Sequence, residues 1–221
     1  MKYEHACIIS SSIGSHLGHV AIEDRFNQTL HSIQTVRDKI KNCCVILVDN
    51  SLLQVDDYKQ AVKEKVDFFI DVCEDPFIAQ YNKAGLKSHC CLMLFRIGLD
   101  ILLNNVEMKN INRVFKLSGR HNITDEFDIS EHTDAIGKCV FKKPVNSWIS
   151  PELKLYESRF FSLHKSNIDF YIEKFQNMFN DCDGTFDIEH SYYRYLKPIT
   201  HEIDNIWVEG VVAGSGLYQK D

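Results

Sequence analysis

The sequence has no long hydrophobic run and no excess of basic residues. Its 221 residues contain 25 Lys and Arg against 31 Asp and Glu, which gives a formal net charge of −6. That balance provides no general attraction to nucleic acid or to anionic lipid. No apolar segment is long enough to span a bilayer, and the first residues lack the pattern of a secretion signal. We therefore expect a cytoplasmic protein with no nucleic-acid partner and no membrane span.

Two common cofactor motifs are also missing. None of the eight cysteines forms a C-x-x-C pair, which disfavours a cysteine zinc site. The adjacent pairs Cys43-Cys44 and Cys90-Cys91 lie in apolar segments, as is typical of reduced core cysteines. No G-x-G-x-x-G follows the first apolar segment, so dinucleotide-dependent oxidoreduction is disfavoured as well.

The first half of the chain alternates between strand and helix patterns. Tyr3 to Ser12 and Cys43 to Val48 have apolar centres typical of buried strands, and Val66 to Val72 follows as a third. Between the first two, apolar residues from Ile22 to Ile40 recur every three or four positions, which predicts an amphipathic helix. Such alternation is typical of a doubly wound α/β fold with a mostly parallel sheet.

Further along the chain, Ser88 is the predicted N-cap of a buried helix from Cys90 to Asn104, and Arg113 to Leu117 is predicted as a strand. After residue 120 the alternation is lost. Short strands are expected at Lys138 to Lys142, Arg159 to Leu163 and Ile206 to Val212, with a helix from Ile168 to Phe179. The four prolines and ten glycines do not cluster into a linker, which predicts one domain over residues 1–221.

Polar residues follow the predicted strands at positions that would share one edge of the sheet. These are Ser10-Ser11-Ser12 after the first strand, Asp49-Asn50-Ser51 after the second, and Ser118-Gly119-Arg120 later in the chain. In open α/β sheets ligands bind at the carboxyl ends of the strands. We expect a ligand site there.

These motifs, in this order, resemble the GT-A glycosyltransferases, in which a strand ending in small residues and a second ending in V-D-x-S form a nucleotide pocket. The similarity continues at Asn82 to Leu86 and covers about residues 1–120. It implies a three-layer α/β/α sandwich, a nucleotide-binding first half, and an acceptor-binding and catalytic half over about residues 121–221. The donor-binding candidates that follow are Ser10, Ser11, Asp49, Asn50, Ser51, Asn82, Lys83, Lys116, Ser118 and Arg120.

The chain departs from this family at the place where a D-x-D motif usually holds a divalent cation. Lys116 to Arg120 reads K-x-S-G-R there, as in GT-A-like transferases of surface-polysaccharide loci, so no metal ligands are carried over. Lys116 and Arg120 offer fixed positive charge for a leaving diphosphate instead. A bound Mn²⁺ or Mg²⁺ stays open, with Asp71, Glu74 and Asp75 as fallback ligands; a literal D-x-D at 181–183 has the composition of a turn.

Glycosyl transfer also requires a base for the acceptor hydroxyl. Asp187, Glu189 and His190 resemble the acidic pair that inverting GT-A enzymes place at the start of a late helix. The alternative is that Asp187 only caps this helix while Glu189 and His190 face solvent. Asp49-Asn50-Ser51 has a similar alternative as an Asx turn, and Arg120 as the partner of a surface carboxylate.

The function predicted from these residues is transfer of a sugar from a nucleotide-sugar donor to a glycan or other hydroxyl acceptor, in surface polysaccharide synthesis. A nucleotidyltransferase of related fold is an alternative, although the loop after the first strand carries no Lys or Arg. A non-catalytic domain that binds a nucleotide or glycan is another.

Overall fold

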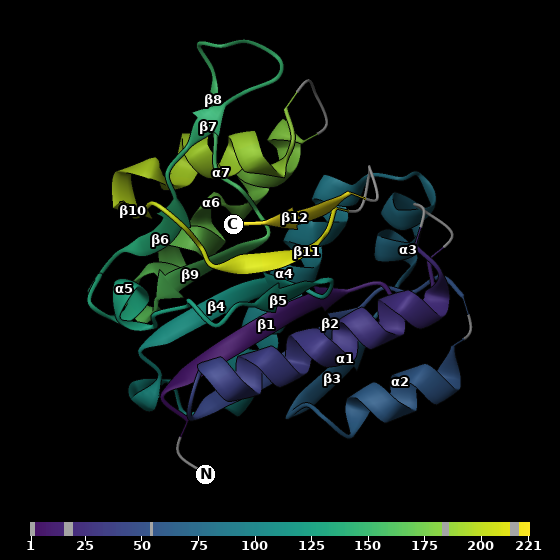
Figure 1. The fold of residues 1–221 in the computed structure, drawn as a ribbon. Helices are drawn as coiled ribbons and strands as arrows, with labels where there is room; N and C mark the ends of the chain where they lie inside the picture. Colours follow the sequence, from purple (N-terminus) through teal and green to yellow (C-terminus); the bar gives the residue numbers. More distant parts are fainter. Residues whose placement is uncertain (1–2, 16–19, 54, 183–185, 213–216) are drawn as a thin grey trace.

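Strands and helices alternate along the first half of the computed structural model (Figure 1). The structure describes all residues except 1–2, 16–19, 54, 183–185 and 213–216. The strands are β1 (His5–Ser11), β2 (Cys43–Asp49), β3 (Phe68–Asp71), β4 (Arg113–Ser118), β5 (His121–Ile123), β6 (Cys139–Lys142), β7 (Val145–Asn146), β8 (Lys154–Leu155), β9 (Phe160–His164), β10 (Thr200–Ile203), β11 (Val208–Val211) and β12 (Tyr218–Lys220). The α-helices are α1 (Ile22–Lys39), α2 (Asp56–Lys63), α3 (Pro76–Lys83), α4 (Lys87–Asn105), α5 (Ser130–Thr133), α6 (Ile168–Asp181) and α7 (Ile188–Leu196). Single 3-10 turns are η1 (Met108–Asn110), η2 (Lys165–Asn167) and η3 (Lys197–Ile199).

The main sheet has seven strands in the order β10-β6-β9-β4-β1-β2-β3. β1 pairs in parallel with β2 and β4, β2 with β3, and β10 with β6, whereas β9 is antiparallel to both of its neighbours. Because β1, β2 and β4 are parallel and in close register, their carboxyl ends lie at the same edge. A small sheet of β12, β11 and β5 and the β7–β8 hairpin complete the strands.

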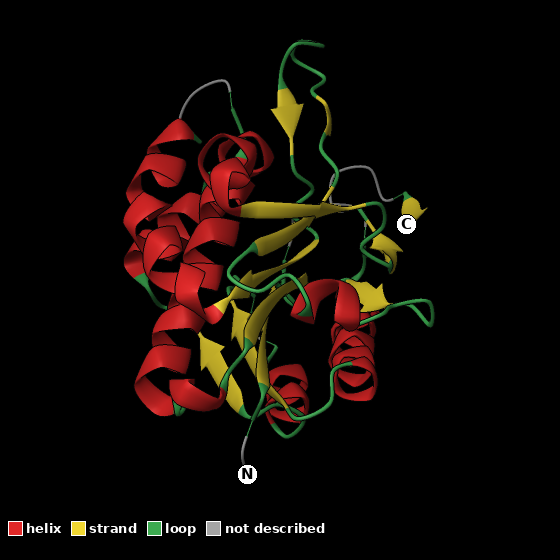
Figure 2. Cartoon of the chain, turned by 90° about the vertical axis from the view of Figure 1, so that its left-hand side faces the viewer, coloured by secondary structure: helices red, strands yellow, loops and turns green. Residues whose placement is uncertain are grey.

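Helices cover both faces of the main sheet, so the chain forms the predicted three layers (Figure 2). On one face α3, α4, α6 and α7 pack over a core that includes Ile8, Ile46 and Phe161. On the other, α1 and α2 pack with residues of the small sheet over a core that includes Ile9, Leu47 and Phe115. Successive strand residues thus alternate between two hydrophobic cores, which is why β1 and β2 are apolar throughout. The predicted α/β/α fold with a mostly parallel sheet is confirmed.

The helix α4 lies between the sheet and α6 and α7, which explains why its sequence is apolar almost all round. A Cβ atom at Gly98 would come within 2.4 Å of Ile8 Cγ2, so glycine there lets the helix approach β1. The predicted N-cap was wrong: α4 begins at Lys87, and the Ser88 hydroxyl accepts a hydrogen bond from the Ile188 amide of α7 instead. The short helix α3 was not predicted; Asp75 caps it.

A buried arginine holds the segment around α5 against the sheet. Arg113 is fully buried, and its guanidinium donates to Ser162 Oγ and to the carbonyl oxygens of Ala135 and Lys138. The Ser162 hydroxyl also hydrogen-bonds with Nδ1 of His132, which is fully buried. Burial, followed by the nearby Arg113 charge, lowers the pKa of His132 to about 3.

We predict that His132 makes the fold less stable at acid pH. Between pH 6.5, the ordinary value of histidine, and pH 3, the unfolded chain takes up a proton that the folded chain does not, so stability falls as the pH falls through this range. From pH 7 to pH 5 this one group should lower the free energy of unfolding by about 2 kcal/mol. Urea unfolding at both pH values is the measurement, and His132→Gln should weaken the pH dependence. His31→Gln, on the exposed face of α1, should not alter it; equal dependence in both variants contradicts the prediction.

Candidate active site

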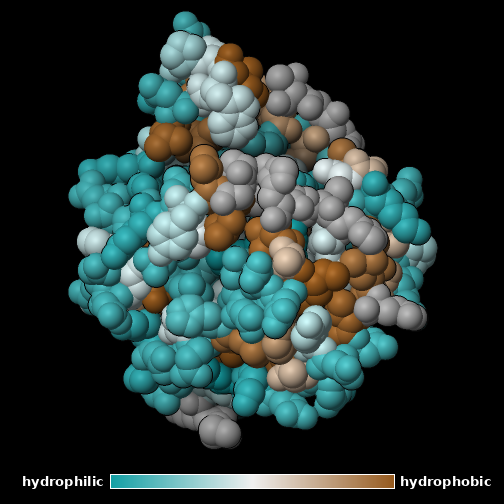
Figure 3. All heavy atoms as spheres, turned by 45° about the vertical axis from the view of Figure 1, so that its right-hand side comes forward, coloured by the Kyte–Doolittle hydropathy of each residue, from teal (hydrophilic) through white to brown (hydrophobic). Residues whose placement is uncertain are grey.

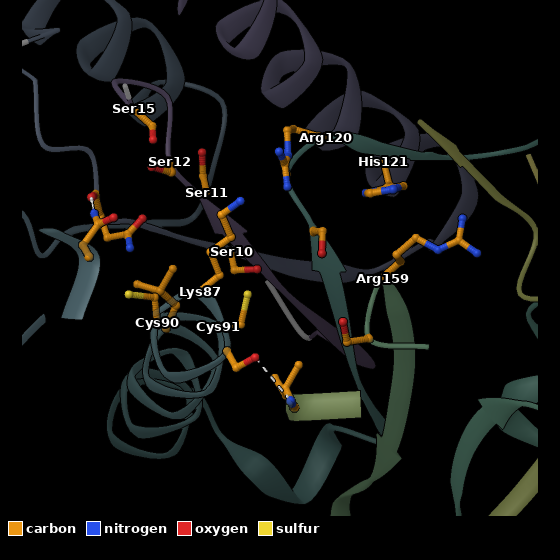
Figure 4. Close-up of a pocket in the computed structure, with 18 of the residues that line it drawn as sticks. Ser10, Ser11, Ser12, Ser15, Lys87, Cys90, Cys91, Arg120, His121 and Arg159 are labelled. Atoms are coloured by element: carbon orange, nitrogen blue, oxygen red, sulfur yellow. Dashed lines mark hydrogen bonds between the residues drawn. The ribbon is translucent and has the colours of Figure 1, made fainter. Parts of the chain in front are cut away.

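A pocket of about 430 Å³ opens where β1, β2 and β4 end, between α1 on one side and the starts of α4 and α7 on the other (Figure 4). Its walls combine small polar residues of the strand ends with charged residues from the helices and turns around them. The lining includes Ser10, Ser11, Ser12, Arg25, Thr29, Asn50, Asn82, Lys87, Cys90, Cys91, Ser118, Gly119, Arg120, His121, Ser158, Arg159, Asp187 and Glu189. The face of the molecule drawn in Figure 3 carries both hydrophilic and hydrophobic residues.

Asp49 and Ser51 lie behind the pocket and tie its loops together. The Asp49 carboxylate accepts hydrogen bonds from the Ile13 and Ser51 amides, and the Ser51 hydroxyl accepts one from the Gly14 amide. Both residues are fully buried, and neither is among the lining residues. The hydrogen bond from the Ser51 amide to the Asp49 carboxylate forms an Asx turn, which was the alternative interpretation of this segment. Asp49 therefore positions the ends of β1 and β2 and does not lie on the pocket wall.

Four of the other predicted donor-binding residues do line the pocket, at the ends of β1 and β2 and on α3. Ser10 and Ser11 end β1, Asn50 follows β2, and Asn82 Nδ2 donates to the Asn50 carbonyl oxygen at 2.6 Å. The Asn50 side-chain oxygen is buried and has no hydrogen-bond partner in the described part of the chain. Lys83 lies outside this group, because its side chain is exposed on α3 and absent from the lining.

Lys116 lies beneath the pocket. It is fully buried, and its ammonium group donates to Ser118 Oγ at 2.7 Å and to the Ser158 carbonyl oxygen at 2.5 Å. Burial lowers the pKa of Lys116, and the Glu189 carboxylate is one of the charges that oppose this. Of the predicted K-x-S-G-R segment, Ser118, Gly119 and Arg120 reach the pocket while Lys116 supports it from below.

Arg120 extends from the β4–β5 turn toward the serines at the end of β1 (Figure 4). No described residue provides its guanidinium with a carboxylate or a hydrogen-bond partner. Burial lowers the pKa of Arg120, and the positive charge of Arg25 lowers it further. Arg25 lies on α1, is buried, and donates to the Val20 and Ser12 carbonyl oxygens. The surface-pair alternative for Arg120 does not describe this arrangement, in which two guanidinium groups face one pocket.

Two carboxylates stand across the pocket, at the start of α7. Asp187 caps this helix, as its alternative interpretation held: Oδ1 accepts from the Glu189 and His190 amides. Glu189 lies in the pocket wall, where Oε1 accepts from the Ser158 amide and hydroxyl. Burial raises the pKa of Glu189, the Ser158 hydrogen bonds oppose this, and the Asp187 charge adds to it. Glu189 is thereby a stronger base than an exposed carboxylate.

His190 is buried behind Asp187 and does not line the pocket. Its Nδ1 hydrogen-bonds with Asp187 Oδ1 at 2.8 Å and its Nε2 with Ser147 Oγ at 2.7 Å. With both ring nitrogens engaged, His190 orients Asp187 and joins α7 to the segment that carries β7. Trp148 of that segment packs edge-on against the same ring.

The described residues include no assembled set of ligands for a divalent cation. Lysine and arginine occupy the place of the D-x-D carboxylates, and no described group of three or more His, Cys, Asp or Glu side chains is arranged to hold an ion. Of the fallback ligands, Asp71 pairs with Lys59 at 2.7 Å and Asp75 caps α3. In the D-x-D at 181–183, residue 183 lies outside the described residues, and Asp181 pairs with Arg194.

Sequence reasoning missed Arg25, His121 and Arg159, all of which line the pocket. One signal was available: Arg25 and Thr29 lie on the buried side of α1, together with Ser32, Ile33 and Val36. Thr29 Oγ1 donates to the Gly119 carbonyl oxygen at 3.1 Å, which brings α1 to the β4–β5 turn. A polar pair on a buried helix face indicates contact with a polar site.

No protein-family model and no curated protein sequence matches this chain. Solved structures do resemble it. The bifunctional glycosyltransferase WbbM superposes with a TM-score of 0.52 at 9% identity, over 92% of this chain and 39% of that one. The galactosyltransferase LgtC, solved with donor and acceptor sugar analogues, gives 0.47 at 8% identity over 89% and 72%. The 4-diphosphocytidyl-2C-methyl-D-erythritol synthase of Anaerococcus prevotii gives 0.48 at 14% identity over 91% and 87%.

The likeness to WbbM shows the class of fold: this chain has a glycosyltransferase-like α/β fold. At 9% identity it carries no activity, substrate or site from one protein to the other. No helix among the described residues is long and apolar enough to cross a membrane.

The pocket contains a cysteine that can report its occupancy. Cys91 of α4 lines the pocket, whereas the half-buried Cys73 lies outside it beside Asp71. We predict that a saturating nucleoside diphosphate slows alkylation of Cys91 by N-ethylmaleimide at least about fivefold, because a bound ligand excludes the reagent. Mass spectrometry of the two peptides measures both rates. Cys73 should react at an unchanged rate; equal slowing of both thiols would indicate global tightening of the fold.

Proposed function

We propose that this protein transfers a sugar from a nucleotide-sugar donor to a hydroxyl of a glycan or another acceptor. The observation that carries the proposal is the Arg120 guanidinium, which faces the pocket beside Arg25 and has no carboxylate partner among the described residues. Two positive charges in a partly desolvated pocket favour an anionic ligand. The diphosphate of a nucleotide sugar has the matching charge.

In the proposed binding mode the nucleoside lies along the ends of β1 and β2. Ser10, Ser11 and Asn50 offer hydroxyl and amide groups there, and the unpartnered Asn50 oxygen can accept from a ribose hydroxyl or a base. The diphosphate then lies at Arg25 and Arg120, and the sugar projects toward α7. In this arrangement about residues 1–120 form most of the donor site and about residues 121–221 the acceptor and catalytic half, within one domain.

Glu189 is the proposed base. It takes the proton from the acceptor hydroxyl as that oxygen attacks the anomeric carbon and the bond from this carbon to the diphosphate breaks. Both electrons of the broken bond leave with the nucleoside diphosphate, whose added charge Arg25 and Arg120 stabilise. Asp187 raises the basicity of Glu189 through its negative charge, and His190 holds Asp187 in place. We propose that these fixed cations serve where related enzymes use a metal ion, and that the acceptor belongs to surface polysaccharide synthesis in the cytoplasm.

Donor binding is tested by thermal shift with UDP-, GDP-, CMP- and dTDP-linked sugars, in EDTA and in Mn²⁺. A donor at a hundred times its Kd stabilises the fold by about 2.7 kcal/mol, which raises Tm by about 5 to 10 °C. We expect this rise in EDTA for one class of donor. Arg120→Ala should lower its affinity at least about tenfold, because a charge-assisted hydrogen bond is lost.

The matched control is Arg96→Ala, because Arg96 pairs with Asp100 on α4, lies over the Phe175 ring and is not among the pocket-lining residues. It should bind as the wild type does. No stabilisation by any donor would contradict the proposed function, and stabilisation only with Mn²⁺ would contradict the metal-free clamp. Release of pyrophosphate from a nucleoside triphosphate would indicate a nucleotidyltransferase, and binding without turnover a non-catalytic domain.

The role of Glu189 predicts a specific kinetic change. Glu189→Gln should lower kcat by a factor of about 10² to 10⁴ while donor affinity stays within about twofold, since the amide cannot take the proton. Because burial raises the pKa of Glu189, wild-type kcat should fall with decreasing pH at a higher pH than an exposed glutamate would give. Glu173→Gln on the exposed side of α6 is the control. Full turnover by Glu189→Gln would exclude Glu189 as the base.

A further inference from the structure

His121 is a buried pocket residue whose ring is unsatisfied. It begins β5 directly after Arg120, lines the pocket and is 3% exposed. Neither ring nitrogen has a hydrogen-bond partner in the described part of the chain. An unpartnered buried polar group is unfavourable, because it has given up its hydrogen bonds to water. A ligand bound in the pocket can therefore supply the hydrogen-bond partner that the ring lacks.

The backbone around His121 makes room for this ring. In the small sheet His121 pairs with Gly210 of β11. A Cβ atom at Gly210 would lie 2.1 Å from the Arg120 carbonyl oxygen, 2.9 Å from His121 Cα and 3.0 Å from its Cδ2, and Gly210 has φ +156°, which side chains rarely adopt. Glycine at this position lets β11 approach the backbone of Arg120 and His121 and leaves space beside the ring.

The charges that face His121 are positive. Arg120 precedes it, and Arg159 directly precedes β9 (Figure 4). Lys116 lies on β4. The Arg159 side chain pairs through Nη2 with Glu157 and Asp221, whereas its buried Nη1 has no partner among the described residues. From β11, Gly210 pairs with His121 and Glu209 with the following residue Asn122, and α1 adds Arg25 to the pocket. Burial, then these three cations, lower the pKa of His121 to about 3, so its ring is neutral in the empty pocket.

We propose that His121 donates a hydrogen bond to the diphosphate of the bound donor and takes up one proton from solvent as the donor binds. The inference rests on the proposed function, because it requires a ligand with a diphosphate. Two negative charges at this place offset the field of Arg159, Arg120 and Lys116, which adds to burial in keeping the empty ring neutral. The imidazolium that forms has a proton on both nitrogens and adds a positive charge where the leaving diphosphate gains negative charge.

Isothermal titration in two buffers with different heats of ionisation measures this proton. The probes are UDP-glucose and GDP-mannose, whose diphosphate diesters do not titrate between pH 5.5 and 8, so any proton taken up belongs to the protein. We expect about half a proton or more per bound donor at pH 6 and almost none at pH 8, with affinity at least about twofold higher at pH 6. His121→Asn should take up no proton, and the exposed His31→Asn should behave as the wild type does.

A second measurement needs no substitution. The ¹⁵N shifts of the His121 ring in the wild-type protein distinguish imidazole from imidazolium, and they should change to the protonated form when the donor is added at pH 6. Donor binding without proton uptake, or the same uptake in His121→Asn, would overturn the inference and leave the proposed function in place. If the wild type binds neither probe, and no donor stabilises it, the proposed function fails and this inference with it.

Discussion

The hydrogen bonds made by the end of β2 hold the pocket in shape, because they join loops from three separate parts of the chain. Asp49 and Ser51 bind the amides of the loop after β1, and the Asn50 carbonyl receives the Asn82 side chain at the end of α3. All of these groups are buried, so water does not compete for them. The parallel pairing of β1 with β2 and β4 places the strand ends side by side, and these bonds then fix the loops that follow.

Opposite charges lie on opposite sides of the resulting pocket. One side carries Arg25 and Arg120, and the other carries Asp187 and Glu189. Lys116 connects the two sides from below: its ammonium group binds Ser118 and the Ser158 carbonyl, and the Ser158 amide and hydroxyl bind Glu189. The local excess of positive charge on the first side exists in a chain whose net charge is −6, so it is a property of the site and not of the composition.

The fold of the first half could be predicted because its elements bury large apolar faces. β1 and β2 are covered on both sides, and α4 lies between the sheet and two further helices, so each leaves a long apolar pattern in the sequence. The second half of the sequence has weaker apolar patterns. Its strands are two to five residues long, and β9 runs antiparallel between β4 and β6, a pairing that depends on distant segments. The helix α3 has eight residues and little periodicity, which is why only its end at Asn82 was noticed.

The residue types and their order along the chain determined by themselves that strand ends rich in serine, asparagine and basic groups would meet at one edge of an α/β sheet. Which of those side chains reach the pocket was decided only by the tertiary structure. Asp49 and Lys116 are turned into backbone hydrogen bonds, while Arg25 and His121, which no motif marked, line the cavity. The reason is physical: a strand end fixes where the backbone stops, but the partners available within hydrogen-bonding distance determine where a polar side chain points, and those partners come from segments far away in the sequence.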